Sequence, residues 1–322
     1  MKHYILGTVA AFALASAAEA QQRVVIATIT SPTSHFGLGA EAFFDTLEEL
    51  SDGKFVGEQA PAGQLGGERD LIEGLQIGSV DMALISSGPL GNFVPEAYAF
   101  DLPFLFRDYD HARAVLDGEI GQELLEKVNE QNLVGLAWGE NGFRHVTNNV
   151  RPVLAPEDLD GLKMRTMENK VHMAAFTGLG ASPTPMAFPE LFGALQTGVV
   201  DGQENPVTVI SASKFWDVQK YASLTGHVYS PAILLASPVL FDGLTEEEQG
   251  WFYEAAAAAV EANRAEVNRL EEAGVALMRE NGMEVTTQID KAPFARLAEE
   301  ASYGVYTDEY GSEMIERIKA VE

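Results

Sequence analysis

The sequence predicts an α/β protein with two similar lobes and one long bracing helix. The chain has 322 residues, 46 % of them hydrophobic, which is enough for a sizeable core and favours two domains over one. A β-branched run at 23–30 precedes a helical pattern at 36–50, and this alternation is typical of a parallel sheet. Two later segments, 71–81 and 191–201, resemble each other.

Residues 1–20 have the pattern of a secretory signal peptide. Lys2 and His3 precede an apolar stretch at 4–15, and small residues follow as far as Ala18-Glu19-Ala20. The stretch is shorter than the roughly 20 residues that a spanning helix needs, so we expect export and cleavage after Ala20. The chain has no cysteine, and we therefore expect a protein without disulfides that is not lipid-anchored.

The paired segments and one further segment define the main helices. In each of 71–81 and 191–201 a helix is expected to end at a glycine, Gly78 or Gly198, and to turn directly into a strand. Two lobes of similar structure explain the pair, and two unrelated helix ends remain the alternative. A capping box at Thr245-Glu-Glu-Glu248 opens the longest helical signal, which runs to Asn281-Gly282. At 1.5 Å per residue this helix would span about 54 Å and brace both lobes, unless it breaks near Gly274.

The charge balance excludes one class of partner and points to another. With 21 basic and 48 acidic residues the formal net charge is −27, so nucleic acid is not an expected partner. One window is net positive, because residues 144–170 hold five cations and only four acids. Chance clustering on a solvated face is the alternative to an anion site there. The five cations are Arg144, Arg151, Lys163, Arg165 and Lys170.

Motifs of catalysis or metal binding are not found. The six histidines form no HExxH or similar arrangement, and neither a GxSxG elbow nor a P-loop occurs. Gly37-Leu-Gly39 follows a strand but lacks the third glycine of a dinucleotide site. We therefore expect no enzyme activity, no cofactor and no metal.

Polar residues cluster where predicted strands end, which is where open α/β sheets bind ligands. Arg144 follows the strand expected at 133–138, Arg165 ends a short strand at 161–165, and Asn205 lies at the exit of the strand that begins at 199. A planar guanidinium binds a carboxylate through two parallel hydrogen bonds. The sequence thus predicts a site for a small organic anion, with a structural ion pair as the alternative role of either arginine.

Several motifs, in order along nearly the whole chain, resemble the extracytoplasmic solute-binding proteins of TRAP transporters, the DctP family. The resemblance implies a two-lobe periplasmic binding protein fold with hinge strands, closure around one organic anion, and delivery to integral membrane subunits. It also implies a monomer. The expected lobes are 23–141 with about 231–270, and 142–230 with about 271–322. The matching motifs are Gln64-Leu-Gly-Gly67, Leu102-Pro-Phe104, Gly161-Leu-Lys-Met-Arg165, Ser182-Pro-Thr-Pro-Met-Ala-Phe188, Ala194-Leu-Gln-Thr-Gly198, Val200-Asp-Gly-Gln-Glu-Asn-Pro206 and Lys214-Phe-Trp-Asp-Val-Gln-Lys220.

The same resemblance assigns roles to individual residues. It implies that Arg165 is the principal ligand-holding arginine, that Arg144 is a second one, and that Asn205 is the binding asparagine. A substrate-variable contact falls near Ser86 and Ser87, where sialic-acid-binding members have a glutamate, so sialic acid is not the expected ligand.

Four further contacts are expected around the ligand, with a core or surface role as the alternative for all of them but His35. His35 falls where another substrate-variable contact lies, and Phe188 and Trp216 are candidates to wall the ligand. His172 is a candidate donor, with an exposed position on a helix as its alternative.

The expected ligand is a hydroxy, keto or sugar acid, and a dicarboxylate stays open. An ectoine-type zwitterion is the second choice, since it also offers a carboxylate to Arg165. A receptor that feeds a signalling protein is the alternative function within this fold.

Overall fold

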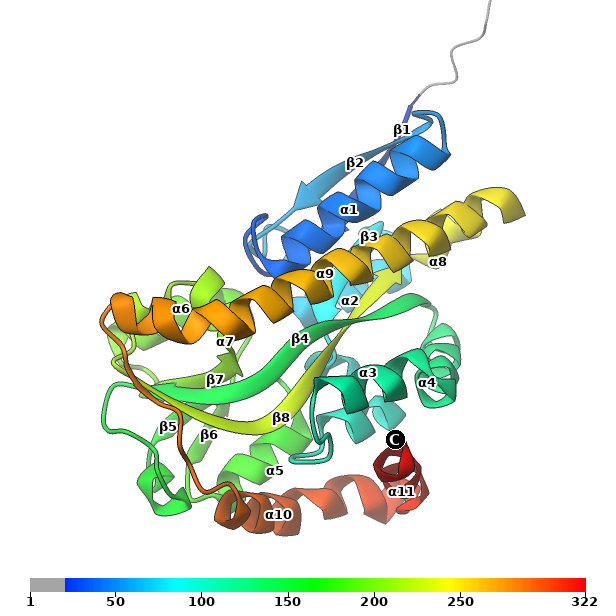
Figure 1. Cartoon of the computed structure of the whole chain (residues 1–322). Coiled ribbons are helices and arrows are strands. Elements are labelled where there is room, and N and C mark those ends of the chain that lie inside the picture. Colours follow the sequence, from blue (N-terminus) through cyan, green and yellow to red (C-terminus); the bar gives the residue numbers. More distant parts are fainter. Residues whose placement is uncertain (1–20) are drawn as a thin grey trace, which may run out of the picture.

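The computed structural model describes residues 21–322, so the expected signal peptide lies outside the described residues. Within them one mixed sheet has the strand order β2-β1-β3-β8-β4-β7-β5-β6, and β9 pairs with β8 beside this path (Figure 1). The strands are β1 (Gln22–Ala27), β2 (Phe55–Ala60), β3 (Met82–Ser86), β4 (Val134–Asn148), β5 (Lys163–Thr166), β6 (Ser182–Pro185), β7 (Gly202–Pro206), β8 (Tyr221–Ala236) and β9 (Glu284–Thr286).

Two long strands join the halves of the sheet. β4 and β8, of 15 and 16 residues, pair antiparallel along most of their length. β1, β2 and β3 run parallel to one another beside one end of this pair, and β5, β6 and β7 run parallel beside the other end. The β4–β8 pairing shifts register at three places, one of them between Glu140 and Gly142. Such irregularities bend a strand, and the positive φ of Gly142 (121°) suits glycine.

Helices cover both faces of the sheet and alternate with the parallel strands. Ser34 caps the first helix by accepting a hydrogen bond from the Gly37 amide. The α-helices are α1 (His35–Leu50), α2 (Glu68–Ile77), α3 (Tyr109–Asp117), α4 (Glu119–Asn129), α5 (Lys170–Gly178), α6 (Phe188–Thr197), α7 (Val207–Ala212), α8 (Pro238–Phe241), α9 (Glu246–Glu280), α10 (Ala292–Tyr310) and α11 (Glu313–Ala320). The 3₁₀ helices are η1 (Gly88–Asn92), η2 (Pro95–Asp101), η3 (Pro156–Leu159) and η4 (Phe215–Asp217).

The two similar segments adopt the same local structure, as predicted. α2 ends at Gly78 (φ 76°) and leads into β3, and α6 ends at Gly198 (φ 72°) and leads into β7. Both glycines adopt the left-handed conformation that terminates a helix at low cost. Equivalent βα units therefore stand in the two halves of the sheet.

The longest helix, α9, has 35 residues and continues through Gly274 without a break. Its capping box forms as predicted, because the Thr245 hydroxyl accepts from the Glu248 amide and the Glu248 carboxylate accepts from the Thr245 amide. In Figure 1 the helix runs diagonally from α8 past α1 to α7, alongside both halves of the sheet.

The last two helices pack on different parts of the molecule. Phe294 and Ala298 of α10 share a buried cluster with Phe176 of α5. Ile315 and Ile318 of α11 belong instead to the cluster around α3 and α4. No helix within residues 21–322 is both long enough and apolar enough to cross a bilayer.

Candidate ligand-binding site

Arg165 lies on β5 and is 2 % exposed. Its Nε and Nη2 both donate to the Met186 carbonyl, at 2.9 and 2.7 Å, whereas Nη1 has no hydrogen-bond partner within residues 21–322. The guanidinium carbon lies 5.9 Å from the centre of the Phe188 ring. Burial lowers the pKa of Arg165 to about 10, although Glu204 opposes that shift, so the side chain is still a cation at neutral pH.

A small, partly enclosed cavity lies beside Arg165. On one side it is lined by a residue that follows β1, by the last residue of β3 and by residues on α1 and α2. On the other side it is lined by residues in or just after β5 and by residues of α6, β7 and α7. Asn141 on β4 lies where the two halves meet. The lining residues are Ile29, Phe36, Glu68, Ser86, Asn141, Arg165, Met167, Phe188, Asn205 and Val209.

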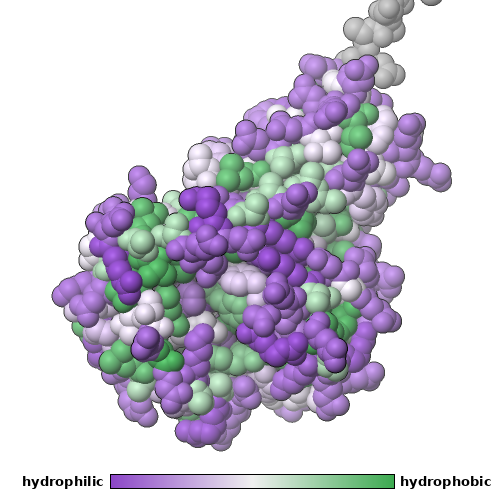
Figure 2. All heavy atoms as spheres, in the orientation of Figure 1, coloured by the Kyte–Doolittle hydropathy of each residue, from purple (hydrophilic) through white to green (hydrophobic). Residues whose placement is uncertain are grey.

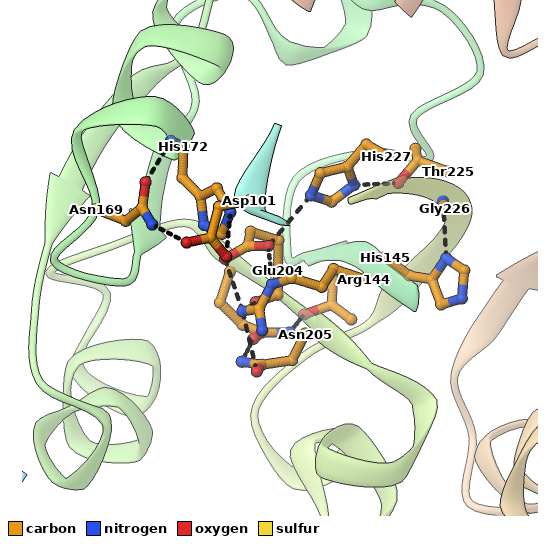
Figure 3. Close-up of polar contacts among 12 residues, drawn as sticks. Asp101, Arg144, His145, Asn169, His172, Glu204, Asn205, Thr225, Gly226 and His227 are labelled. Atoms are coloured by element: carbon orange, nitrogen blue, oxygen red, sulfur yellow. Dashed lines mark hydrogen bonds and ion pairs between the residues drawn. The ribbon is translucent and has the colours of Figure 1, made fainter. Parts of the chain in front are cut away.

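Arg144 is fully buried and forms an ion pair with Glu204 (Figure 3). Its Nε donates to Glu204 Oε2 at 2.5 Å and its Nη2 to Oε1 at 2.8 Å, and the His227 ring lies 3.1 Å from the same carboxylate. Burial alone would raise the pKa of Glu204, but Arg144 and His227 outweigh it and hold the pKa well below its usual range. Arg144 thus forms the structural ion pair that the sequence analysis gave as its alternative role. It does not line the cavity.

One geometric expectation for Arg144 is wrong. The sequence placed it beyond the end of a strand at 133–138, but β4 runs without interruption from Val134 to Asn148 and Arg144 lies within it. Polar residues continue the strand here because β7 and β8 pair with it on both sides and satisfy its backbone.

Asn205 lines the cavity and contacts the ion pair. Its Oδ1 accepts from Nη2 of Arg144 at 3.1 Å and its Nδ2 donates to Gln203 Oε1. The side chain therefore couples the Arg144–Glu204 pair to the cavity wall.

Ser86, the last residue of β3, and Ser87, which follows it, have different hydrogen-bond partners. Ser86 lines the cavity, and its hydroxyl and its amide both donate to Glu68 Oε1. Ser87 is also buried but donates to Asp101 at 3.0 Å and does not line the cavity.

The two candidate histidines are buried and do not line the cavity. His35 Nε2 lies 2.9 Å from Asn141 Oδ1, and burial lowers the pKa of His35 to about 4. His172 is 1 % exposed rather than on a helix surface. Its ring lies beside Asp101 (Figure 3), with Nε2 3.8 Å from Asp101 Oδ1, beyond hydrogen-bonding distance.

The two aromatic candidates, Phe188 and Trp216, line different hollows of the protein. Phe188 lines the cavity, as noted above. Trp216, on η4, lines a different surface hollow together with Asp217 and Lys220.

Glu68, which the sequence analysis did not single out, also lines the cavity. It is 5 % exposed and is the first residue of α2. An acidic residue in the first turn of a helix is common for electrostatic reasons, so its type and position gave no signal of a binding role. Within residues 21–322 no cluster of side chains suits a metal ion.

Comparisons with known proteins agree with this geometry. The family model described as bacterial extracellular solute-binding protein, family 7, matches residues 26–307. A solute-binding protein of Verminephrobacter eiseniae is 46 % identical over 305 residues, covering 95 % of this chain and 91 % of that protein.

Two solved structures are similar over nearly their whole length. A TRAP periplasmic solute-binding protein from a Polaromonas species, bound to D-erythronate, is 49 % identical with a TM-score of 0.92, covering 94 % of this chain and 99 % of that one. One from a Bordetella species, with density assigned to pantoate, is 48 % identical with a TM-score of 0.91, covering 94 % and 100 %.

Two half-sheets joined by long strands, with a cavity of mixed polar and apolar lining between them, define the class of extracytoplasmic solute-binding proteins. This chain belongs to family 7 of the bacterial extracellular solute-binding proteins, the DctP family of TRAP receptors. The predicted family and two-lobe α/β fold are confirmed. Members of this family are periplasmic receptors for small organic acids, and its solved relatives are binding proteins rather than enzymes.

Proposed function

We propose that this protein captures a small organic acid through an ion pair between Arg165 and the ligand carboxylate, and delivers it to TRAP membrane subunits. One observation carries the proposal. Arg165 is a buried cation whose Nη1 has no partner within residues 21–322 and whose other bonds go to a neutral carbonyl. A buried charge without an ion-pair partner is costly, and an anion in the adjoining cavity would supply one.

The remaining cavity residues suit the polar parts of such a ligand. Asn205 offers an amide, and Glu68 and Ser86 offer acceptors and donors from the opposite wall. Phe188 provides an apolar surface, which is usual in ligand pockets. The cavity is small, and this favours a small acid.

The relatives support the same ligand class. D-Erythronate and pantoate, found in the two solved relatives, are hydroxy monocarboxylates. Arg144 already has Glu204 as its counter-charge, so a single arginine is available to a ligand carboxylate. A hydroxy monocarboxylate therefore fits the site better than a ligand that needs both arginines.

The cellular setting of the proposal follows from the family. Residues 1–20 would direct export and be removed after Ala20, leaving a monomer in the periplasm without a lipid anchor. The two lobes would close on the ligand through bending of β4 and β8. The lobe boundaries expected from the sequence remain a proposal, and we add that α11 moves with the first lobe, because it packs on α3 and α4.

The Arg165→Ala variant tests the proposed contact. Removing the guanidinium leaves a buried carboxylate unpaired, which costs about 2–5 kcal/mol, so we expect affinity for D-erythronate or another bound organic acid to fall at least roughly 30-fold. Thermal-shift screening identifies the acid, since a ligand at 1,000 times its Kd adds about 4 kcal/mol of stability, and calorimetry then measures the loss.

Arg269→Ala is the matched control, because Arg269 is exposed on α9 and pairs only with Glu266 within residues 21–322. Unchanged affinity in a folded Arg165→Ala protein would refute the assignment. Uptake by vesicles that contain the membrane subunits, with and without this protein, tests delivery.

A further inference from the structure

Two buried charges without an ion-pair partner face the same cavity. Arg165 and Glu68 line it, and neither forms an ion pair within residues 21–322. The nearby Arg144 and Glu204 neutralise each other. Arg165 comes from β5 and Glu68 from α2, in opposite halves of the sheet. A ligand between them therefore meets a cation at one end and a carboxylate at the other.

Glu68 is not needed to cap its own helix. The amide of Gly67, which precedes α2, donates to Asp70 at 2.9 Å, so Asp70 already fills the capping role. The hydrogen bonds that Glu68 accepts within the described chain come from the Ser86 amide and hydroxyl, and both end at Oε1. They fix Oε1 against β3, and Oε2 accepts no hydrogen bond within residues 21–322.

The groups around Glu68 shift its pKa in opposite directions. Burial raises the pKa of Glu68, while the Ser86 hydrogen bonds and the positive charges of Arg165 on β5 and Arg144 on β4 act against this rise. The pKa of Glu68 is raised on balance, although two donors aimed at one oxygen favour the ionised form. An ionised carboxylate is an acceptor only, so it can accept a ligand hydroxyl but repels a second ligand carboxylate.

We propose that Glu68 determines specificity, by accepting a hydrogen bond from a ligand hydroxyl and rejecting dicarboxylates of the same length. This inference rests on the proposed function, because it places the ligand's carboxylate on Arg165. With Glu68 ionised, the two arginines and two glutamates sum to zero charge, so a monocarboxylate brings these four groups and the ligand to −1 and a dicarboxylate to −2. The substrate class is then a short hydroxy monocarboxylate.

Two matched ligand pairs test the inference by calorimetry at pH 8. D-Erythronate and meso-tartrate differ only at the fourth carbon, which carries a hydroxyl in one and a carboxylate in the other. 4-Hydroxybutanoate and succinate differ in the same way. We expect the wild-type protein to bind the hydroxy acid at least 30-fold more tightly in at least one pair. Absence of this preference in both pairs overturns the inference.

The Glu68→Gln variant removes the charge at nearly constant size. We expect the hydroxy acid to bind more weakly and the diacid as well or better, so that the preference falls at least tenfold. Glu68→Asp keeps the charge and should keep the rejection of the diacid. Glu73→Gln is the matched control, because Glu73 lies on the same helix with its side chain 53 % exposed, and it should leave both affinities unchanged.

The outcomes separate the two proposals. If Arg165→Ala abolishes binding of both acids but Glu68→Gln keeps the wild-type preference, the inference about Glu68 fails and the proposed function stands. If Arg165→Ala leaves both affinities unchanged, the proposed function fails first. Thermal unfolding of each variant without ligand confirms that it folds.

Discussion

Arg144 and Arg165 show how neighbours decide the role of a residue. Both are fully or almost fully buried, and both stand in the one net-positive window of an acidic chain. Arg144 meets the Glu204 carboxylate and becomes part of an internal ion pair, whereas the hydrogen bonds of Arg165 within residues 21–322 go to the Met186 carbonyl. A carbonyl orients a guanidinium but does not neutralise it, so within residues 21–322 Arg165, unlike Arg144, has no ion-pair partner.

His172 gives a pH prediction at the same scale. Burial, only partly opposed by Glu204, lowers the pKa of His172 to about 3, whereas in the unfolded chain it is near 6.5. Below pH 6.5 the unfolded chain binds a proton that the fold does not, so this residue's contribution to stability is present above pH 6.5 and is lost as the pH falls.

Replacing His172 by glutamine should therefore flatten the pH dependence of unfolding. One pH unit within the window corresponds to about 1.4 kcal/mol. Between pH 6.5 and pH 5 we expect the free energy of unfolding of the wild type to fall by about 2 kcal/mol more than that of the variant. Urea unfolding at both pH values measures this, and parallel profiles would show that His172 is protonated equally well in the fold.

At the scale of elements, α9 holds the molecule together through close packing as well as length. Asn263 on α9 donates to the backbone carbonyls of His35 and Glu140 and accepts from the Glu140 amide, which ties α9 to α1 and β4. Farther along, a Cβ on Gly274 would lie 2.2 Å from Cγ1 of Val207 on α7. Gly274, where the sequence analysis allowed a break in the helix, is thus a position of close packing against α7.

Two glycine-to-alanine variants on α9 should change stability in opposite directions. Gly274→Ala forces a methyl group into a packed contact and should lower the free energy of unfolding by about 1–3 kcal/mol. Gly250→Ala, with no neighbouring atom within 4 Å of the new Cβ in residues 21–322, should raise it by about 1 kcal/mol. Urea unfolding compares them, and adding Val207→Ala to Gly274→Ala should recover part of the loss. Equal effects at both sites would argue against the packing explanation.

At the scale of the whole molecule the surface is strongly acidic. The formal net charge is −27, and the face in Figure 2 is covered largely by hydrophilic residues with smaller apolar patches between them. Like charges held close together destabilise a compact state, and salt screens this repulsion beyond about 10 Å at 0.1 M.

We therefore expect salt to stabilise the ligand-free protein. The midpoint of urea unfolding should rise as NaCl increases from about 20 mM to about 0.5 M, because screening relieves the repulsion in the folded state most. KCl should act equally, which separates screening from binding of a particular cation. A midpoint that falls with either salt would mean that surface ion pairs such as Arg264–Asp117 outweigh the repulsion.

The sequence alone was enough to predict those features of the fold that depend on residues close together in the chain. The Thr245 capping box, the glycine ends of α2 and α6 and the βα rhythm all follow from residues a few positions apart, and the ordered motifs identified the family and its fold. The same reasoning placed Arg165, Asn205, Ser86 and Phe188 around one site, and all four line the cavity.

Only the tertiary structure decided which charges remain available. The Glu204 partner of Arg144 is 60 residues away, Ser86 and Glu68 meet through the packing of α2 against β3, and Trp216 faces another hollow. Burial and pairing are properties of the three-dimensional surroundings of a group, and they set its charge and its hydrogen bonds. For that reason a sequence can name the arginines of this site but not tell which one a ligand would find unpaired.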